Sequence, residues 1–499
     1  MVPVLHLVGA PSTKQQKSKP MLHHTLGDGR CVRLTCSTSS LVDSSQSYDA
    51  YLKCAQQFTS SQAMLEHKDQ AASEIDRVLG DCITAARPGY IALPTDLVQV
   101  EISSERLRIP LTRTAPHNNP EEESFVIDEV VKQCEAAGGD AVVLVDVCAI
   151  RHDVRKELNE FLRKTGFPVY AAPMGKTIVD EHYQRYGGVY LGAISHGDVR
   201  EKVESAKLVI TVGSRLSDFN TGNFSYKIKA DRTIQLHSDH TTIQYATYLA
   251  IGMKQLIPKL TVRLESYYER ASKIQVPLFA SPVPKETHTA ITHAWFWPRV
   301  GQFFRPKDVI VTETGTANFG VLDVQLPEQS VLLTQMLWES IGWSVGSTLG
   351  AALAAKEVGL KRSILFVGDG SLQLTVQELS VMLRVGVKPI IFVLNNGGYT
   401  IERYIDRSIT RKYNDISNWN WTSLFKVLGD PEEKISCTYT VRTKEELSAL
   451  LDDTRFASTD KIQLVEVMMD KLDAPRAMQA ELSGQSYDTT SNLARAVWL

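Results

Sequence analysis

The sequence predicts an α/β protein made of consecutive, doubly wound domains with parallel sheets. Short β-branched runs that end in Gly, Asp or Asn recur between stretches with helical periodicity, which is the pattern of βαβ units. The chain has 499 residues, enough for about three domains of ordinary size. The candidate strands lie at residues 4–8, 141–145, 208–212, 309–311, 364–367 and 390–394.

Two stretches of linker composition predict the domain boundaries. Residues 113–123 combine adjacent asparagines with a run of glutamates, and residues 276–289 contain three closely spaced prolines. Linkers of this kind separate compact domains. We therefore expect domains at residues 1–110, 120–270 and 288–475, followed by a polar tail at 476–499.

The first domain contains two unusual stretches. The apolar run at residues 2–9 has no basic flank and contains His6, so it is a poor signal peptide. It predicts instead a buried strand that turns near Pro11. Residues 31–48 are rich in Ser and Thr without helical or alternating periodicity, which favours a surface loop.

Composition and charge exclude several classes of protein. Hydrophobic residues make up 43% of the chain, and 54 Lys and Arg stand against 57 Asp and Glu. A balance of this kind gives no electrostatic support for binding nucleic acid or an anionic membrane. No apolar run approaches the roughly 18 residues of a membrane span. The seven cysteines form no CxxC pair, so we expect reduced thiols and a cytoplasmic protein.

The most informative stretch, residues 363–403, contains two polar motifs that follow two candidate strands. Gly368-Asp369-Gly370 follows the first strand, and Asn395-Asn396-Gly397-Gly398 follows the second. Between them, Leu372, Val376, Leu379 and Leu383 predict one helix after Ser371, which Gly386 and Pro389 end. Such a unit is a right-handed crossover between neighbouring parallel strands, and it brings both motifs to one sheet edge.

The two motifs together predict a Mg²⁺-diphosphate site. The Asp369 carboxylate and the Asn396 amide oxygen are the hard oxygen donors that Mg²⁺ prefers. Gly370, Gly397 and Gly398 allow close backbone approach to an anion, and the following helix start attracts it. Either motif alone would more readily be a tight turn without a ligand. Their occurrence on adjacent strands favours the ligand site.

The spacing of these motifs resembles the family of thiamine-diphosphate-dependent 2-oxo-acid decarboxylases, closest to the fungal pyruvate decarboxylases. The GDG motif is followed after 24 residues by the NN motif, and the resemblance covers nearly the whole chain. The supporting stretches are Leu22-His23-His24-Thr25-Leu26-Gly27, Arg87-Pro88, Leu93-Pro94, Arg151-His152-Asp153, Pro173-Met174-Gly175-Lys176, Ser217-Asp218-Phe219-Asn220-Thr221-Gly222, His237-Ser238-Asp239-His240, Glu313-Thr314-Gly315-Thr316, Leu337-Trp338, Ile341-Gly342 and Tyr399-Thr400-Ile401-Glu402.

The resemblance implies a role for each matching residue. Mg²⁺ would be held by Asp369, Asn396 and the carbonyl of Gly398. Thiamine diphosphate would contact Thr316, Glu339, Ile341, Gly370, Ser371, Asn396, Gly398, Tyr399 and Ile401. In this family Ile341 is a wedge under the cofactor, although an ordinary core isoleucine is the alternative. The catalytic residues would be Glu402, His23 and His24.

The implied reaction is the non-oxidative decarboxylation of a 2-oxo acid, most simply pyruvate, to an aldehyde and CO₂. Such a reaction moves protons. Glu402 in a partly apolar pocket would be an acid near neutrality, and His23 and His24 titrate in the useful range. The resemblance also implies a homodimer or homotetramer. Cys148 and Arg151 match positions linked to substrate activation, although a buried cysteine at a strand end is the simpler interpretation.

Departures from the family pattern leave alternatives open. Met1 falls roughly ninety residues into the pyrimidine-binding domain, about half of a typical domain, and the region before it would hold the carboxylate that activates the cofactor. Glu339 stands where glycine is usual, and residues 31–48 look inserted. The alternatives are a non-catalytic cofactor-binding or interaction protein and a mispredicted gene model. A partial first domain would also leave apolar sheet faces open and lower the solubility.

Overall fold

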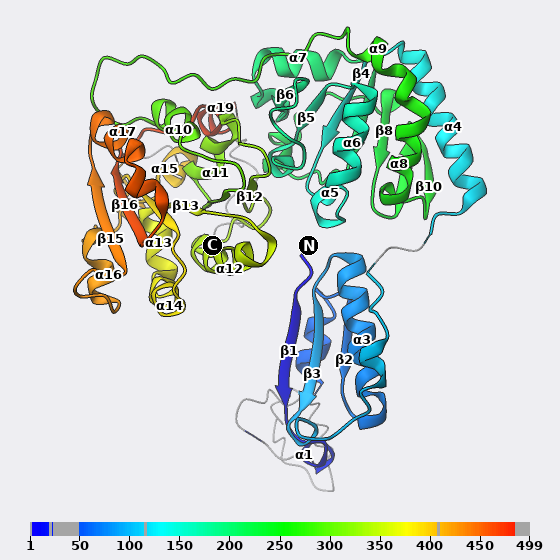
Figure 1. The fold of residues 1–499 in the computed structure, drawn as a ribbon, viewed down its shortest axis with the longest axis horizontal. Helices are drawn as coiled ribbons and strands as arrows, with labels where there is room; N and C mark the ends of the chain where they lie inside the picture. Colours follow the sequence, from blue (N-terminus) through cyan, green and yellow to red (C-terminus); the bar gives the residue numbers. More distant parts are fainter. Residues whose placement is uncertain (1, 19–21, 23–48, 114–116, 407–409, 485–499) are drawn as a thin grey trace, which may run out of the picture. The chain divides into compact units, whose positions relative to one another are not determined.

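The computed structural model describes residues 2–18, 22, 49–113, 117–406 and 410–484, which form two compact units at Met1–Asn118 and Asn119–Leu499 (Figure 1). Mixed α/β structure with mainly parallel strands fills both units, which confirms the predicted fold class. Within the described residues, no helix is both long enough and apolar enough to cross a membrane.

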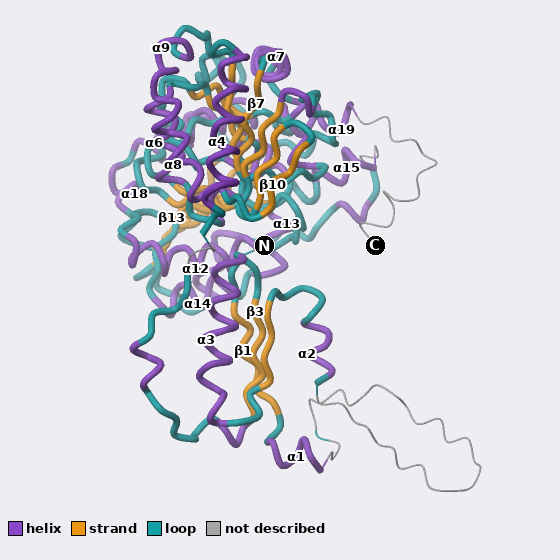
Figure 2. The backbone as a smooth tube through the Cα atoms, turned by 90° about the vertical axis from the view of Figure 1, so that its right-hand side faces the viewer, coloured by secondary structure: helices purple, strands orange, loops and turns teal. Residues whose placement is uncertain are grey.

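The first unit contains a three-stranded parallel sheet with the strand order β1-β3-β2 (Figure 1). Figure 2 shows α3 and α2 on opposite sides of this sheet. A small core lies on each face: Ile91 of the central strand packs toward α3, and Tyr90 and Ala92 pack on the other side with Ala55 of α2. The elements are β1 (Leu5–Ala10), α1 (Thr13–Ser18), α2 (Ala50–Ala55), β2 (Ser61–Met64), α3 (Lys68–Ala85) and β3 (Gly89–Pro94).

The N-terminal strand forms as predicted, but the expectation that it is buried was wrong. In β1, Leu7 is 63% exposed and Leu5 is 36% exposed. The reason is its position at the edge of the sheet, where β3 is the one strand that pairs with it among the described residues. An apolar sequence predicts a strand but not the layer that covers it.

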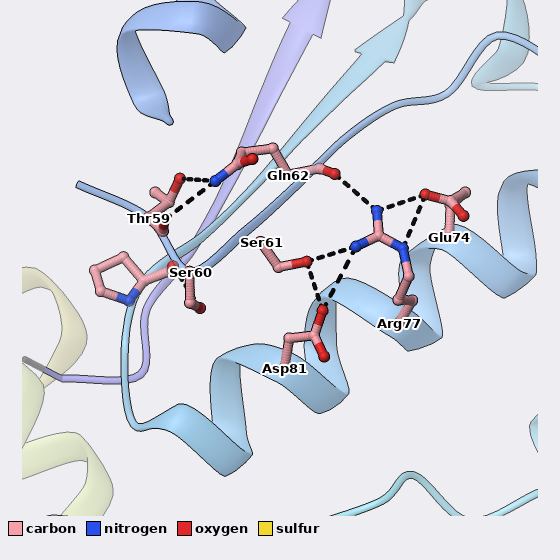
Figure 3. A network of polar contacts seen from close by, with 8 residues as sticks. Thr59, Ser60, Ser61, Gln62, Glu74, Arg77 and Asp81 are labelled. Carbon is pink, nitrogen blue, oxygen red and sulfur yellow. Dashed lines mark hydrogen bonds and ion pairs between the residues drawn. The ribbon is translucent and has the colours of Figure 1, made fainter. Parts of the chain in front are cut away.

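A polar network fastens β2 to α3 in the first unit (Figure 3). The Arg77 guanidinium donates to the Gln62 carbonyl at 2.8 Å and to Ser61 Oγ at 2.7 Å, and it pairs with Glu74 at 2.6 Å. Ser61 Oγ in turn donates to Asp81 at 2.7 Å. Each of these groups has a protein partner, so the network holds the helix on the sheet.

The second unit begins with a seven-stranded sheet in the order β10-β9-β8-β7-β4-β5-β6. Its predicted strands at 141–145 and 208–212 match β4 and β7. The strands β8, β9 and β10 at one end were not predicted; β8 is parallel to β7, and β9 pairs antiparallel with both β8 and β10. The elements are α4 (Pro120–Ala137), β4 (Ala141–Val145), α5 (Cys148–Arg151), α6 (Arg155–Thr165), β5 (Val169–Ala171), β6 (Tyr186–Val189), α7 (Gly197–Ser205), β7 (Leu208–Val212), β8 (Thr233–Leu236), β9 (His240–Ile243), β10 (Ala246–Leu249), α8 (Met253–Leu264) and α9 (Tyr268–Ala271).

The third sheet has six strands, all parallel, in the order β12-β11-β13-β14-β16-β15. Residues 276–289, the predicted linker, precede it and contain no helix or strand. The elements are α10 (His293–Gly301), β11 (Val309–Thr312), α11 (Thr316–Gly320), β12 (Val331–Leu333), α12 (Trp343–Val358), β13 (Ser363–Gly368), α13 (Asp369–Thr375), α14 (Glu378–Val385), β14 (Ile390–Asn395), α15 (Thr400–Asp406), α16 (Leu424–Val427), β15 (Ser436–Val441), α17 (Lys444–Asp452), α18 (Thr454–Ser458), β16 (Ile462–Met468) and α19 (Arg476–Gly484).

Helices cover both faces of the third sheet. In β14, Ile390, Phe392 and Leu394 belong to one core, and Ile391 and Val393 belong to the core on the opposite face. Successive side chains of a strand point to opposite faces, so a strand buried on both sides reads as an unbroken apolar run.

Two local expectations need correction. The single helix predicted after Ser371 begins earlier, at Asp369, and it is broken near Val376 into α13 and α14. Residues 476–484, expected to open a polar tail, form helix α19, whose Ala477, Met478 and Leu482 are buried against Phe319 and Ile401. The stretch is polar in overall composition, so the helix was not predicted, although its few apolar residues lie on one side and are buried.

Candidate active site

The candidate site lies at the carboxyl ends of three neighbouring strands of the third sheet. Strand β11 pairs with β13, and β13 pairs with β14. Thr316 lies just beyond the end of β11, Asp369 follows β13 and Asn396 follows β14. The crossover predicted from the sequence therefore brings both polar motifs to one sheet edge, where α/β proteins bind ligands.

The Asp369 carboxylate organises the loop after β14. One of its oxygens accepts the Gly370 N–H at 2.8 Å, and the other accepts the N–H groups of Gly397 at 2.8 Å and Gly398 at 3.1 Å. Burial raises the pKa of Asp369 to about 6, although these three hydrogen bonds act to lower it. The side chain is thus a buried carboxyl group whose pKa is raised by burial, although the charge of Arg403 also acts to lower it.

Asn396 provides an unused oxygen at the same edge. Its Oδ1 atom is buried and has no hydrogen-bond partner within the described part of the chain. A buried carbonyl oxygen without a partner costs free energy unless a ligand satisfies it. Together with the Asp369 carboxylate, it fits the oxygen donor set of Mg²⁺.

Two glycines of these motifs, Gly398 and Gly370, are required by contacts within the protein. A Cβ atom at Gly398 would lie 2.1 Å from the Asn414 carbonyl oxygen, and φ at Gly398 is +123°. A Cβ atom at Gly370 would lie 2.8 Å from the Tyr399 ring. Close approach to an anion remains a prediction, whereas the close internal packing explains why neither position accepts a side chain.

Arg403 stabilises this loop, a role that no sequence motif indicated. Its buried guanidinium donates to the Gly397 carbonyl at 2.8 Å, the Asn414 carbonyl at 2.9 Å and Asp415 at 3.0 Å. It therefore ties the end of β14 to residues 414–415. Its position next to Glu402 in the quoted motif was the only signal in the sequence.

Glu313 is a second brace that the sequence analysis missed. Its fully buried carboxylate accepts the Thr314 N–H at 2.9 Å, the Ser344 hydroxyl at 2.6 Å and the Gly342 N–H at 3.2 Å. Burial raises its pKa despite these bonds. Glu313 therefore connects the loop that carries Thr316 to the segment that carries Ile341.

Thr316 and Ile341, the two predicted cofactor contacts on the segments that Glu313 connects, differ in solvent exposure. Thr316 is buried at the first turn of α11, and Ile341 is partly exposed just before α12. Partial exposure is unlike an ordinary core isoleucine. The wedge role of Ile341 is compatible with this exposure and stays a prediction.

Glu402 lies among other acidic groups. It is half-buried in the first turn of α15, and burial followed by the charge of Asp406 raises its pKa. Glu339 is buried nearby with φ at +48°, and burial together with Asp218 and Glu402 raises its pKa to about 8. Glu481 of α19, which the sequence did not single out, also reaches a pKa of about 8 through burial, Glu339 and Asp218.

The remaining predicted residues fall into two groups. Gly370 and Ser371 form the first turn of α13, and Tyr399 and Ile401 flank the start of α15, so all four lie next to the polar motifs. His23, His24 and residues 31–48 lie outside the described residues.

Comparisons with known proteins match both domains of the second unit. Residues 135–260 match the family model of the thiamine pyrophosphate enzyme central domain, and residues 314–467 match that of the C-terminal domain, which binds thiamine pyrophosphate. Thiamine pyrophosphate is another name for thiamine diphosphate. The second match spans β13, β14 and both polar motifs.

Curated relatives extend the similarity over nearly the whole chain. A pyruvate decarboxylase of Aspergillus fumigatus is 42% identical over 482 residues, 96% of this chain and 80% of that protein. A putative pyruvate decarboxylase of Schizosaccharomyces pombe is 40% identical over 97% of this chain and 82% of its own length. Pyruvate decarboxylase isozyme 2 of Saccharomyces cerevisiae is 39% identical with the same coverage.

The fold and the donor set at the edge of the third sheet define a thiamine-diphosphate-dependent enzyme. Within that class, the chain belongs to the pyruvate decarboxylase family. The resemblance inferred from the motifs is confirmed, and so is the prediction of a carboxy-lyase of this type. The comparisons do not support the alternative of a non-catalytic interaction protein.

Proposed function

We propose that the protein removes CO₂ from pyruvate, without oxidation, to form acetaldehyde, with thiamine diphosphate and Mg²⁺ bound at the edge of the third sheet. The observation that carries this proposal is the buried Asp369 carboxylate together with Asn396 Oδ1, which follows the neighbouring strand and has no hydrogen-bond partner among the described residues. Membership of the pyruvate decarboxylase family supports the choice of a 2-oxo acid.

Asp369, Asn396 and the Gly398 carbonyl would hold Mg²⁺, and Gly370 and Ser371 would face the diphosphate. Thiamine diphosphate, when bound, supplies the nucleophile and holds the electrons that the departing CO₂ leaves behind. The protein's own contribution begins with geometry, because Arg403 and Glu313 fix the loops that carry these groups.

Glu402 would hold and release the proton that the reaction needs. A carboxyl group with a raised pKa stays partly protonated closer to neutrality than an ordinary glutamate, so it can donate a proton and recover it. Burial is the main cause of the raised pKa, and the negative charge of Asp406 adds to it.

The test is a decarboxylation assay on the full-length protein and its Glu402→Gln variant, which keeps the size of the side chain. We expect kcat to fall by about 10²- to 10⁴-fold, the usual range for a general acid or base, while thiamine diphosphate still binds. Glu433→Gln, on the surface of the same domain, is the control. Unchanged turnover in Glu402→Gln would remove this residue from the mechanism.

Assembly and location complete the proposal. We infer a homodimer or homotetramer from the family, which light scattering on the purified protein tests. We place the enzyme in the cytoplasm because the five described cysteines are unpaired, and fractionation of cells that express it tests that assignment.

A further inference from the structure

The turn between β8 and β9, in the seven-stranded sheet, places two imidazoles and a carboxylate together. His237 and Asp239 belong to the turn and His240 begins β9. The turn is closed by the His237 N–H, which donates to the His240 carbonyl at 3.0 Å, and by the Ala250 N–H, which donates to the Asp239 carbonyl at 2.7 Å. Three side chains on one closed turn lose little conformational entropy when they bind a common ligand.

The three side chains converge on a small space. His240 Nδ1 lies 2.8 Å from Asp239 Oδ1, and His237 Nδ1 lies 3.6 Å from the same oxygen. The two imidazoles stack with their centroids 4.9 Å apart. Ligand atoms around a tetrahedral metal ion with bonds of about 2.0–2.1 Å are about 3.3 Å apart, and the two measured distances bracket that value. One atom from each of the three residues lies within 4.8 Å of the others.

The three side chains supply the donor atoms that a metal ion needs. Imidazole nitrogens and a carboxylate oxygen bind metal ions in their deprotonated forms.

A third imidazole stands beside this group. His152, at the end of α5, is half-buried, and burial and then His237 lower its pKa. Asp239 and Arg151 also act on it electrostatically. These electrostatic effects place His152 in the surroundings of the cluster, although it is not one of the three residues whose ligand atoms converge.

We propose that His237, Asp239 and His240 form a binding site for a first-row transition-metal ion such as Zn²⁺, with the remaining coordination position open to water or another ligand. Two nitrogens and one oxygen favour Zn²⁺ and its neighbours over Mg²⁺, which prefers oxygen ligands. The site belongs to a different sheet from the Mg²⁺ donors Asp369 and Asn396.

Calorimetric titration of the full chain with Zn²⁺, in saturating Mg²⁺, tests the proposal. We expect one Zn²⁺ per chain that Mg²⁺ does not displace, and a visible absorption band when Co²⁺ replaces it. Asp239→Asn and His240→Gln should each weaken Zn²⁺ binding by at least about tenfold. Asp239 has a side chain that is 78% exposed, so Asp239→Asn keeps the fold while it removes a ligand.

The matched control is His182→Gln. His182 lies 3.8 Å from Asp180 on the same domain, an exposed histidine–aspartate pair outside the three-residue cluster. This variant should bind Zn²⁺ like the parent protein. The proposal is overturned if the parent binds no Zn²⁺, if Asp239→Asn binds it unchanged, or if His182→Gln weakens binding as much as His240→Gln.

Discussion

Strand β14 of the third sheet and strand β1 of the first unit are both short apolar runs, but their surroundings differ. β14 lies between β13 and β16 and is buried throughout. Among the described residues β1 has one neighbouring strand, and its Leu5 and Leu7 are exposed. The same kind of apolar sequence therefore forms a fully buried central strand in one region and an exposed edge strand in the other. The chemistry was predicted at the end of the strand that is fully enclosed.

The largest contrast between the two regions should appear when one aspartate is neutralised in each. Asp369→Asn removes the buried charge at the end of β13, and we expect Mg²⁺-dependent binding of thiamine diphosphate to weaken by on the order of 100-fold or more. Asp81→Asn, in the network of Figure 3, should leave binding unchanged because its side chain is 51% exposed. Fluorescence titration measures both, and equal losses would refute the assignment of Asp369.

Loss of a packed side chain should lower the free energy of unfolding by several kcal/mol more in β14 than in β1. Phe392 stacks on Phe366 with centroids 5.0 Å apart and is fully buried, so Phe392→Ala should lower the free energy of unfolding by about 3–5 kcal/mol. Leu7→Ala should change it by no more than about 0.5 kcal/mol. Urea denaturation compares the two variants. A large cost for Leu7→Ala would mean that β1 is covered in solution.

The two regions should also respond differently to pH. The raised pKa of Asp369, about 6, means that its contribution to the stability of the metal-free protein is present below pH 3.8 and lost as the pH rises through about 6. Protons compete with Mg²⁺ for this carboxylate, so the Mg²⁺ affinity should fall by about tenfold from pH 7 to pH 5.

In the first unit, Asp96 shows the opposite shift. Hydrogen bonds from the Thr13 hydroxyl and N–H lower its pKa, so its contribution is present above pH 3.8 and lost as the pH falls through the lowered value. Calorimetric Mg²⁺ titrations at several pH values check the site. The decrease of Mg²⁺ affinity at low pH should disappear in Asp369→Asn and persist in Asp96→Asn.

The smallest expected effect concerns the exposed side of β1. Leu5→Lys with Leu7→Lys places charge on an apolar edge strand, a change that opposes edge-to-edge association. We expect less aggregation in light scattering and little change in the unfolding transition of the second unit. The matched pair Ser103→Lys with Ser104→Lys adds the same charge elsewhere in the unit. Equal improvement in both variants would show that net charge, rather than the strand, is responsible.

Much of the third sheet could be predicted because the apolar runs of its strands, and the helical pattern between them, are local features of the sequence. The runs at 364–367 and 390–394 predicted β13 and β14, and the helix between them required the two strands to be parallel neighbours. That adjacency placed Asp369 and Asn396 at one edge. The break between α13 and α14 was missed, because the apolar stripe continues through Val376 in the sequence.

Groups that act across long stretches of chain could not be predicted. Glu481 reaches the surroundings of Glu339 from the last helix, and Glu313 binds the start of α12 through Ser344. Glu481 has no local pattern that marks it, and Glu313 was visible only as the first residue of the family motif Glu313-Thr314-Gly315-Thr316. The group of possible metal ligands at His237, Asp239 and His240 appeared in the sequence only as part of a family motif. The folded turn shows that their ligand atoms lie close together.

The sequence by itself determined the α/β class, the family and the edge at which the polar motifs meet, because hydrophobic periodicity and the geometry of a crossover act over short distances along the chain. The tertiary structure decided which carboxyl groups are buried away from water, and which side chains of β1 stay exposed. It also decided that Asn396 Oδ1 has no hydrogen-bond partner among the described residues. Those properties depend on burial. Burial is set by elements from distant parts of the chain, which only folding brings together.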